Sequence, residues 1–131
     1  MGWASMKHLI DTNVWIDALA GRLSAESFLR ISVEVDWAGY SAITRLELFG
    51  FPGIKTSEES KIADLLKPFE EVAVTSSIID RAIKIRKKAK VKVPDAIIAG
   101  TAQACGCHLI TRNVDDFKII PGLKIINPFD L

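Results

Sequence analysis

The sequence predicts an α/β fold with a mainly parallel sheet, and two observations support this prediction. Short apolar segments alternate along the chain with longer segments in which apolar residues recur at helical spacing. This alternation is typical of strand–helix–strand units, in which the strands run parallel. The chain has 131 residues and is 49% hydrophobic, so it is large enough to bury one core. We therefore expect a single domain over residues 1–131, with residues 1–5 as a loose extension.

Each expected element has a local cause in the sequence. The strand-like segments are 7–10, 37–41, 71–75, 108–111 and 124–127. The segments with helical spacing are 12–19, 25–33, 42–49, 57–66, 78–89 and 94–104. Ser24 and Ser77 are favourable N-caps for the second and fifth of these helices, and Pro94 suits the first turn of the sixth. Gly21 and Gly106 end the first and the sixth, because glycine readily adopts the left-handed conformation that stops a helix.

The charge, the cysteines and the hydropathy of the chain limit the classes of function that it can have. The formal net charge is +1, so no overall field attracts nucleic acid, and only local clusters of charge can do so. Cys105 and Cys107 are separated by one residue, a spacing that fits a reduced, cytoplasmic compartment better than a disulfide. No run of about 18 apolar residues predicts a membrane span, so we expect a soluble protein without membrane contact.

Four carboxylates follow a predicted strand, lie in the helix after one, or open a helix. They are Asp11, Glu47, Asp95 and Asp116. Because ligands of open α/β sheets bind beyond the carboxyl ends of the strands, we expect these four side chains to converge. Converging carboxylates repel one another, and burial raises their pKa values, unless a cation is present. A hard divalent ion such as Mg²⁺ prefers oxygen ligands and can activate water for phosphodiester hydrolysis.

Each of these carboxylates also has a purely structural interpretation. Asp11 is a favourable N-cap for the helix that follows it. Glu47 lies three residues after a threonine, which is the spacing of a capping box. Asp95 is stabilised by the positive end of its own helix without any ligand, and Asp115 and Asp116 suit a solvated turn. For each acid taken alone, the structural interpretation stays open. Only the occurrence of all four acids in one chain favours a shared site.

Longer motifs around the four acids resemble the PIN domain, and within it the VapC-like toxin ribonucleases. The matching motifs occur in the order of that family and are Leu-Ile-Asp-Thr-Asn-Val at 9–14, Ser-Ala-Ile-Thr-Arg-Leu-Glu-Leu at 41–48, Pro-Asp-Ala-Ile-Ile-Ala at 94–99 and Leu-Ile-Thr-Arg-Asn-Val-Asp-Asp-Phe at 109–117. Together they span nearly the whole chain from Lys7. The resemblance implies a three-layer α/β/α sandwich with a parallel sheet. It also implies a site for Mg²⁺ or Mn²⁺ and endonucleolytic cleavage of RNA, with transfer RNA as the substrate expected from the family.

The resemblance implies site residues and partners as well. Carried over by position, the catalytic and metal-binding acids are Asp11, Glu47, Asp95 and Asp116, with Asp115 as an alternative fourth acid. The polar side chains expected to support them are those of Thr12, Asn13, Thr111 and Asn113. The resemblance further implies a homodimer that a small antitoxin protein inhibits. An apolar run suits an antitoxin or dimer surface, although core packing explains it equally well, and its members are Leu46, Phe49, Phe51 and Pro52.

Basic residues cluster between Arg81 and Lys92, where seven of the seventeen lysines and arginines fall within twelve positions. A charged helix of this kind is most often a solvated face. Beside an acidic nuclease site it has a second use, because it can bind the RNA phosphates that the acids repel. The RNA-binding residues predicted on this basis are Lys87, Lys88, Lys90 and Arg112.

Two other function classes compete with the ribonuclease hypothesis. A haloacid-dehalogenase-like phosphohydrolase or a receiver-type phosphoacceptor domain also has an Asp at the end of its first strand. The phosphohydrolases have a second Asp two residues later, where this chain has Asn13. A non-catalytic RNA-binding or protein-binding scaffold that keeps the acids for stability is the third hypothesis, since fold does not imply function. We rank both below the metal-dependent endoribonuclease.

Overall fold

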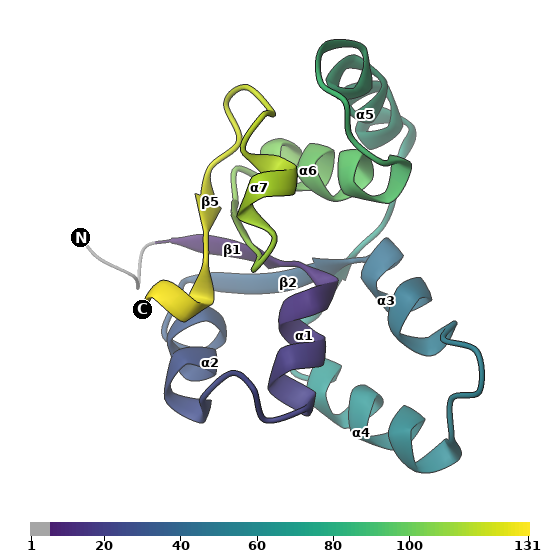
Figure 1. Cartoon of the computed structure of the whole chain (residues 1–131), viewed down its shortest axis with the longest axis vertical. Helices are drawn as coiled ribbons and strands as arrows, with labels where there is room; N and C mark the ends of the chain where they lie inside the picture. The colour runs from purple at the N-terminus through teal and green to yellow at the C-terminus, as the bar shows by residue number, and fades with distance from the viewer. Residues whose placement is uncertain (1–5) are drawn as a thin grey trace.

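The computed structural model describes residues 6–131 and contains one five-stranded sheet (Figure 1). The strands are β1 Lys7–Ile10, β2 Trp37–Ser41, β3 Glu70–Val72, β4 His108–Ile110 and β5 Ile125–Ile126. Their order across the sheet is β3-β2-β1-β4-β5, and every neighbouring pair is parallel. The first strand of the chain is therefore the central strand of the sheet. The loose extension predicted for residues 1–5 lies outside the described residues.

Helices cover both faces of the sheet. They are α1 Thr12–Leu19, α2 Ala25–Ser32, α3 Ala42–Phe49, α4 Thr56–Leu66, α5 Ser76–Lys88, α6 Val93–Cys105 and α7 Val114–Phe117, followed by a 3-10 turn at Pro128–Asp130. Figure 1 shows α5, α6 and α7 on one side of the sheet and α1, α2 and α4 on the other. The predicted three-layer α/β/α sandwich with a parallel sheet is therefore confirmed. No helix in residues 6–131 is both long and apolar enough to cross a membrane.

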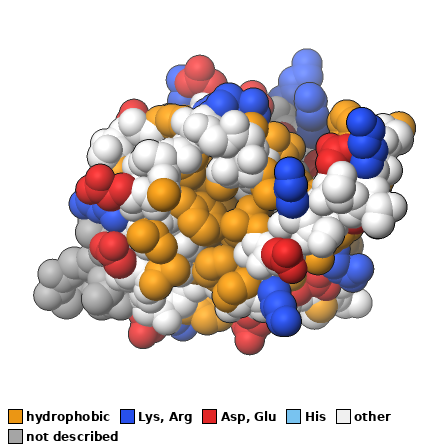
Figure 2. Space-filling view, turned by 90° about the horizontal axis from the view of Figure 1, so that it is seen from below, with side chains coloured by type: hydrophobic (Ala, Val, Ile, Leu, Met, Phe, Trp, Pro, Cys, Tyr) orange, Lys and Arg blue, Asp and Glu red, His pale blue; other side chains and the backbone are white. Residues whose placement is uncertain are grey.

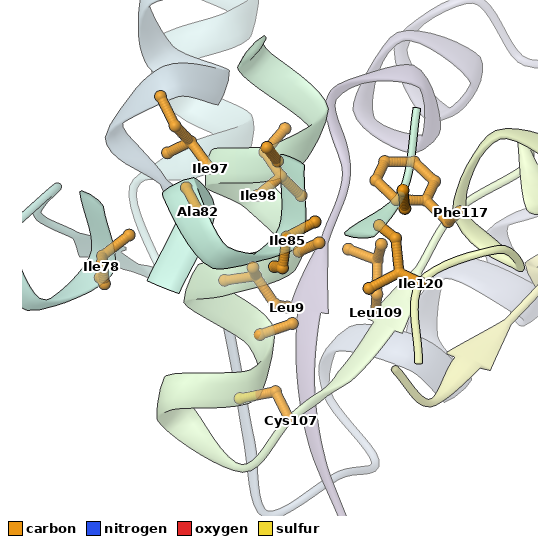
Figure 3. Packing of buried hydrophobic residues seen from close by; sticks show 14 residues of the cluster. Leu9, Ile78, Ala82, Ile85, Ile97, Ile98, Cys107, Leu109, Phe117 and Ile120 are labelled. Atoms are coloured by element: carbon orange, nitrogen blue, oxygen red, sulfur yellow. The ribbon is translucent and has the colours of Figure 1, made fainter. Parts of the chain in front are cut away.

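The core is divided in two by the sheet because successive residues of a strand point to opposite faces. Leu9 and Leu109 pack against α5, α6 and α7 (Figure 3), whereas Ile10 and Ile110 pack against the opposite layer. In that second layer the fully buried Trp15 of α1 donates a hydrogen bond from Nε1 to the carbonyl of Ile10 at 3.1 Å. The helix that follows β1 is thus fixed to the strand that precedes it.

Most predicted boundaries agree with the structure to within two residues, and two differences have clear causes. The strand predicted at 71–75 is Glu70–Val72, and the following helix begins at Ser76, earlier than predicted. Thr75, and not Ser77, is its N-cap, because the Thr75 hydroxyl accepts a hydrogen bond from the backbone N–H of Ile78. The short helix α7 was not predicted.

Candidate active site

Asp11 lies at the carboxyl end of the central strand. Its backbone N–H donates to the Ile110 carbonyl at 2.9 Å and continues the ladder between β1 and β4. Its side chain is the N-cap of α1, and Oδ1 accepts a hydrogen bond from the Thr12 backbone N–H at 2.8 Å. The other oxygen, Oδ2, accepts from Thr111 Oγ1 at 2.8 Å and from Asn13 Nδ2 at 3.0 Å. Helix capping therefore accounts for one oxygen only, and side chains from two separate segments orient the other.

The polar residues predicted to support the site lie around Asp11, but they contribute in different ways. Asn13 and Thr111 donate side-chain hydrogen bonds to its carboxylate, and Thr12 donates its backbone N–H. Asn113 takes part only through its backbone N–H, which donates to Thr111 Oγ1 at 3.1 Å. Since Thr111 follows β4 and Asn13 lies in α1, the hydrogen bonds tie two neighbouring strand ends together.

Glu47 is joined to Asp11 through Thr12, whose hydroxyl donates to Glu47 and whose backbone N–H donates to Asp11. Thr12 Oγ1 donates to Glu47 Oε1 at 2.7 Å and lies 2.9 Å from the hydroxyl of the fully buried Thr44. Because the Thr12 hydrogen is used on Glu47, Thr44 is the donor in the second contact. The capping-box interpretation of Glu47 is wrong. The N-cap of α3 is Ser41, so Glu47 lies in the second turn of the helix, beyond reach of the N-cap backbone.

Asp95 and Asp116 are the acids of the site that belong to α6 and α7. Asp95 is the third residue of α6 and is half-buried, and Asp116 is an exposed residue in the first turn of α7. Burial raises the pKa of Asp95, and the charges of Asp116 and Glu47 raise it further, whereas the charge of Lys92 lowers it. Asp115 instead forms an ion pair of 2.9 Å with Lys118 and is 90% exposed.

The four acids share one electrostatic environment. Burial raises the pKa of Asp11 from an ordinary value of 3.8 to about 6, and the charges of Asp95 and Glu47 act in the same direction. Hydrogen bonds from Thr111 and Thr12 oppose this shift without cancelling it. Within residues 6–131, no three His, Cys, Asp or Glu side chains lie close enough together to hold a metal ion, so the four acids do not converge as tightly as expected. The donors present are all carboxylate oxygens, and these suit Mg²⁺ or Mn²⁺, which keep waters in their coordination shell.

Comparison with known proteins identifies the family. Residues 8–123 match the model of the PIN domain family. The chain belongs to the PIN domain family. This family is one of nucleases, and the resemblance predicted from the motifs is confirmed. No curated protein matched the sequence.

Solved structures with the same fold include complexes of toxins with antitoxins. A toxin–antitoxin complex from Klebsiella pneumoniae contains a chain with 35% identity and a TM-score of 0.75, over 92% of this chain and 97% of that one. VapBC2 from Rickettsia felis, bound to a DNA fragment from its promoter, gives 23% identity and a TM-score of 0.81, over 93% and 98%. DNA-bound VapBC from Salmonella typhimurium gives 22% and 0.80, over 94% and 98%. The last two comparisons establish the PIN fold.

The basic residues predicted to bind RNA lie in two different settings in this PIN domain. Lys87 and Lys88 are exposed in the last turn of α5, and Lys90 is exposed in the connection that leads to Asp95. Arg112 is engaged with the protein itself, because its Nη1 donates to Asp17 Oδ1 at 3.0 Å. Asp17 was not among the residues selected from the sequence. The available signal was an acidic residue on the buried side of an apolar helix.

An apolar groove of about 370 Å³ lies between α1, α3 and α4 of the PIN domain. Figure 2 views the molecule from this side and shows hydrophobic side chains gathered in a hollow. The apolar residues that line the groove are Ile16, Leu19, Leu48, Phe51, Ile54 and Ile62. Glu47 also lines it, so the groove and the acidic site share a side chain. Of the predicted apolar run, Phe51 faces the groove, whereas Phe49 packs against the core.

Proposed function

We propose that this PIN domain is a divalent-metal-dependent endoribonuclease and the toxin of a toxin–antitoxin pair. The observation that carries the proposal is the buried Asp11, whose pKa is raised to about 6 among neighbouring carboxylates. Carboxylates gathered in this way are unfavourable without a cation, and a bound divalent ion removes the repulsion. The Klebsiella pneumoniae chain, which is 35% identical, comes from a toxin–antitoxin complex and supports the biological role.

Within the proposed site the acids have separate roles. Asp11 and Asp95 are the principal ligands, and Glu47 binds directly or through water. Asp116 is the fourth acid, because its charge raises the pKa of Asp95, whereas Asp115 is paired with Lys118. When bound, Mg²⁺ or Mn²⁺ supplies the activation of water and the stabilisation of the leaving oxygen in phosphodiester hydrolysis.

The chain holds this chemistry in place through its own hydrogen bonds. Thr111 and Asn13 fix the orientation of the Asp11 carboxylate, and the Thr12 hydroxyl fixes Glu47. The exposed Lys87, Lys88 and Lys90 provide positive charge for the RNA backbone, which the acids would otherwise repel. RNA is the proposed substrate, with transfer RNA as the class that the resemblance suggests.

The proposed antitoxin binds in the apolar groove between α1, α3 and α4. A helix or extended segment with apolar side chains would cover the exposed Leu19 and Phe51, and it would lie directly against Glu47. A segment bound in the groove would therefore lie next to the acidic site and limit access to it. We also propose that the protein forms a homodimer, because the resemblance to the VapC-like toxins implies one.

The test is RNA cleavage by the purified protein, mapped by sequencing new 5′ ends in a total RNA pool. We expect cuts at a few defined sites with Mg²⁺ or Mn²⁺, and none with EDTA or in Asp11→Asn. The matched control is Asp36→Asn, which changes an exposed carboxylate just before β2, away from the carboxyl ends of the strands. Cleavage by folded Asp11→Asn at the parent rate would contradict the assignment.

Two other outcomes separate the competing hypotheses. A folded protein that neither cleaves RNA nor binds Mn²⁺ would favour the non-catalytic scaffold. Stable labelling of Asp11 by beryllofluoride would favour a phosphoacceptor. Asn13 argues against the phosphohydrolase, because it occupies the position of the second Asp of that class and donates a hydrogen bond to Asp11. An amide cannot act there as a general acid.

A further inference from the structure

Asp17 is a charged residue that the proposed chemistry does not use. It lies in α1, and its side chain is fully buried. Its Oδ1 accepts from Arg22 Nε at 2.9 Å and from Arg112 Nη1 at 3.0 Å. Its Oδ2 is buried and accepts no hydrogen bond from any residue in 6–131. A buried carboxylate is costly unless it is paired, so the two arginines are the compensation that the fold provides.

One of these arginines belongs to the segment that orients the site. Arg112 directly follows Thr111, whose hydroxyl donates to Asp11 Oδ2 at 2.8 Å. The backbone N–H of Arg112 donates to Asn13 Oδ1 at 3.2 Å. Asn13 and Asp17 are four residues apart in α1 and so project from the same face of the helix. The helix therefore holds Arg112 twice, by its backbone at Asn13 and by its guanidinium at Asp17.

We propose that Asp17 is a positioning residue of the nuclease site, acting on Asp11 through Arg112 and Thr111. The Asp17–Arg112 ion pair fixes the backbone after β4 against α1, and Thr111 then presents its hydroxyl to Asp11. Arg112 is accordingly a tether and not a phosphate contact, in contrast to the expectation from the sequence. This inference rests on the proposed function of the site, because the Asp11 carboxylate is its endpoint.

Arg22 provides an internal control. It contacts the same oxygen of Asp17 as Arg112 does, but it lies in the turn after α1, and its backbone N–H bonds to the Asp17 carbonyl. Neither of these hydrogen bonds involves an acid of the site or the segment 111–113. Substitution of Arg22 removes half of the charge pairing at Asp17 and leaves the ion pair with the site segment intact. Substitution of Arg112 removes the ion pair with the site segment and leaves the ion pair between Asp17 and Arg22 intact.

The experiment compares Asp17→Asn, Arg112→Ala and Arg22→Ala in the full-length protein. We expect Asp17→Asn and Arg112→Ala to lower kcat about 10-fold with little change in KM, the size seen when residues behind a metal ligand are removed. The double variant should be no worse than the more severe single variant, because both act through one ion pair. Arg22→Ala should cleave RNA like the parent. In amide hydrogen exchange, Arg112 or Asn113 should lose protection in the first two variants and keep it in Arg22→Ala.

Three results would overturn the inference. Equal loss of stability in Arg112→Ala and Arg22→Ala, with kcat unchanged in both, would make the ion pairs purely structural. A raised KM and a flatter salt dependence in Arg112→Ala alone would make Arg112 a phosphate contact. Unchanged amide exchange at 112–113 in Asp17→Asn and Arg112→Ala would show that the tether does not hold the segment. If the parent protein neither cleaves RNA nor binds Mn²⁺, the proposed function fails, and amide exchange alone still decides on the tether.

Discussion

The two halves of the acidic site are held by different kinds of interaction. In the β1 half, Asp11 and Glu47 accept hydrogen bonds from Thr12, Asn13 and Thr111. In the α6 half, Asp95 and Asp116 accept no side-chain hydrogen bond from any residue that the structure describes. Asp95 instead lies at the positive end of α6 and near the charge of Lys92. The carboxylates of the β1 half are therefore oriented before an ion binds. The carboxylates of the α6 half supply negative charge and remain free to change their orientation.

This difference follows from where the chain places the residues. Asp11 directly follows the central strand, so its neighbours on both sides are fixed by the sheet. The backbone of Asp95 is equally well fixed, because the residues after it in α6 are buried from Ala96 to Ala102. Its side chain, however, lies in the first helical turn and accepts no hydrogen bond from any residue in 6–131. A rigid backbone thus does not guarantee an oriented carboxylate.

The largest expected effect separates the two halves directly. Asp11→Asn should lower kcat about 1,000-fold, because loss of the ion forfeits several kcal/mol of transition-state stabilisation. Asp116→Asn should lower kcat only about 10-fold. The Asp116 side chain is exposed, so a water molecule can take the place of its carboxylate in the coordination shell of the ion. Single-turnover cleavage with saturating Mn²⁺ measures both, with circular dichroism as the control for folding. Equal losses would show that the halves do not differ in function.

The next effect is the part of the pH dependence of stability that Asp11 contributes. Its folded-state pKa of about 6 lies above the ordinary value of 3.8, so protonation favours the folded protein. The contribution is fully present below about pH 4 and is lost as pH rises through 6, up to about 3 kcal/mol in total. Urea unfolding in EDTA should therefore show the parent losing stability relative to Asp11→Asn between these pH values. Saturating Mn²⁺ should reverse the trend, because the ion binds the charged form.

A parallel difference at all pH values in EDTA would contradict this prediction. It would mean that the hydrogen bonds to Asp11 offset its burial completely. The comparison with Asp11→Asn is essential here because other carboxylates titrate in the same range. Asn keeps the size of the side chain and one acceptor oxygen, so the two proteins differ mainly in the titrating proton.

A smaller effect tests the orientation of the β1 half. Thr111→Val removes the hydroxyl that donates to Asp11 and leaves the shape of the side chain almost unchanged. We expect about a 10-fold loss in kcat or in Mn²⁺ affinity, as is usual for residues that orient a ligand. The control is Thr101→Val in α6, where an equally buried hydroxyl donates to the Ile97 carbonyl of its own helix. Matching losses in the two variants would reduce the role of Thr111 to general stability.

Local alternation and strand ends predicted the parallel sheet and the position of Asp11, and the resemblance to the PIN domain implied the three layers. The sequence did not predict α7, since a four-residue helix without a side-chain cap is too short for a periodic pattern. It also left Glu47 between two interpretations that share one spacing. The position of the N-cap at Ser41 rules out the capping box, and it could not be located from the spacing alone. Asp17 was missed because its partner, Arg112, lies 95 residues later in the chain.

The smallest expected effect concerns the basic residues that lead into the α6 half. Lys87→Ala combined with Lys88→Ala should weaken RNA binding a few-fold and reduce the slope of log affinity against log salt by about 0.7 for each phosphate that is no longer neutralised. The control pair is Lys55→Ala with Lys67→Ala, two exposed lysines at the ends of α4 on the other face of the sheet. Binding of inactive Asp11→Asn protein to RNA, measured across a salt series, excludes effects of cleavage. If both pairs change the slope equally, the lysines at the end of α5 attract RNA only through the net charge of the protein. No particular lysine would then offset the repulsion between the acids of the α6 half and the RNA phosphates.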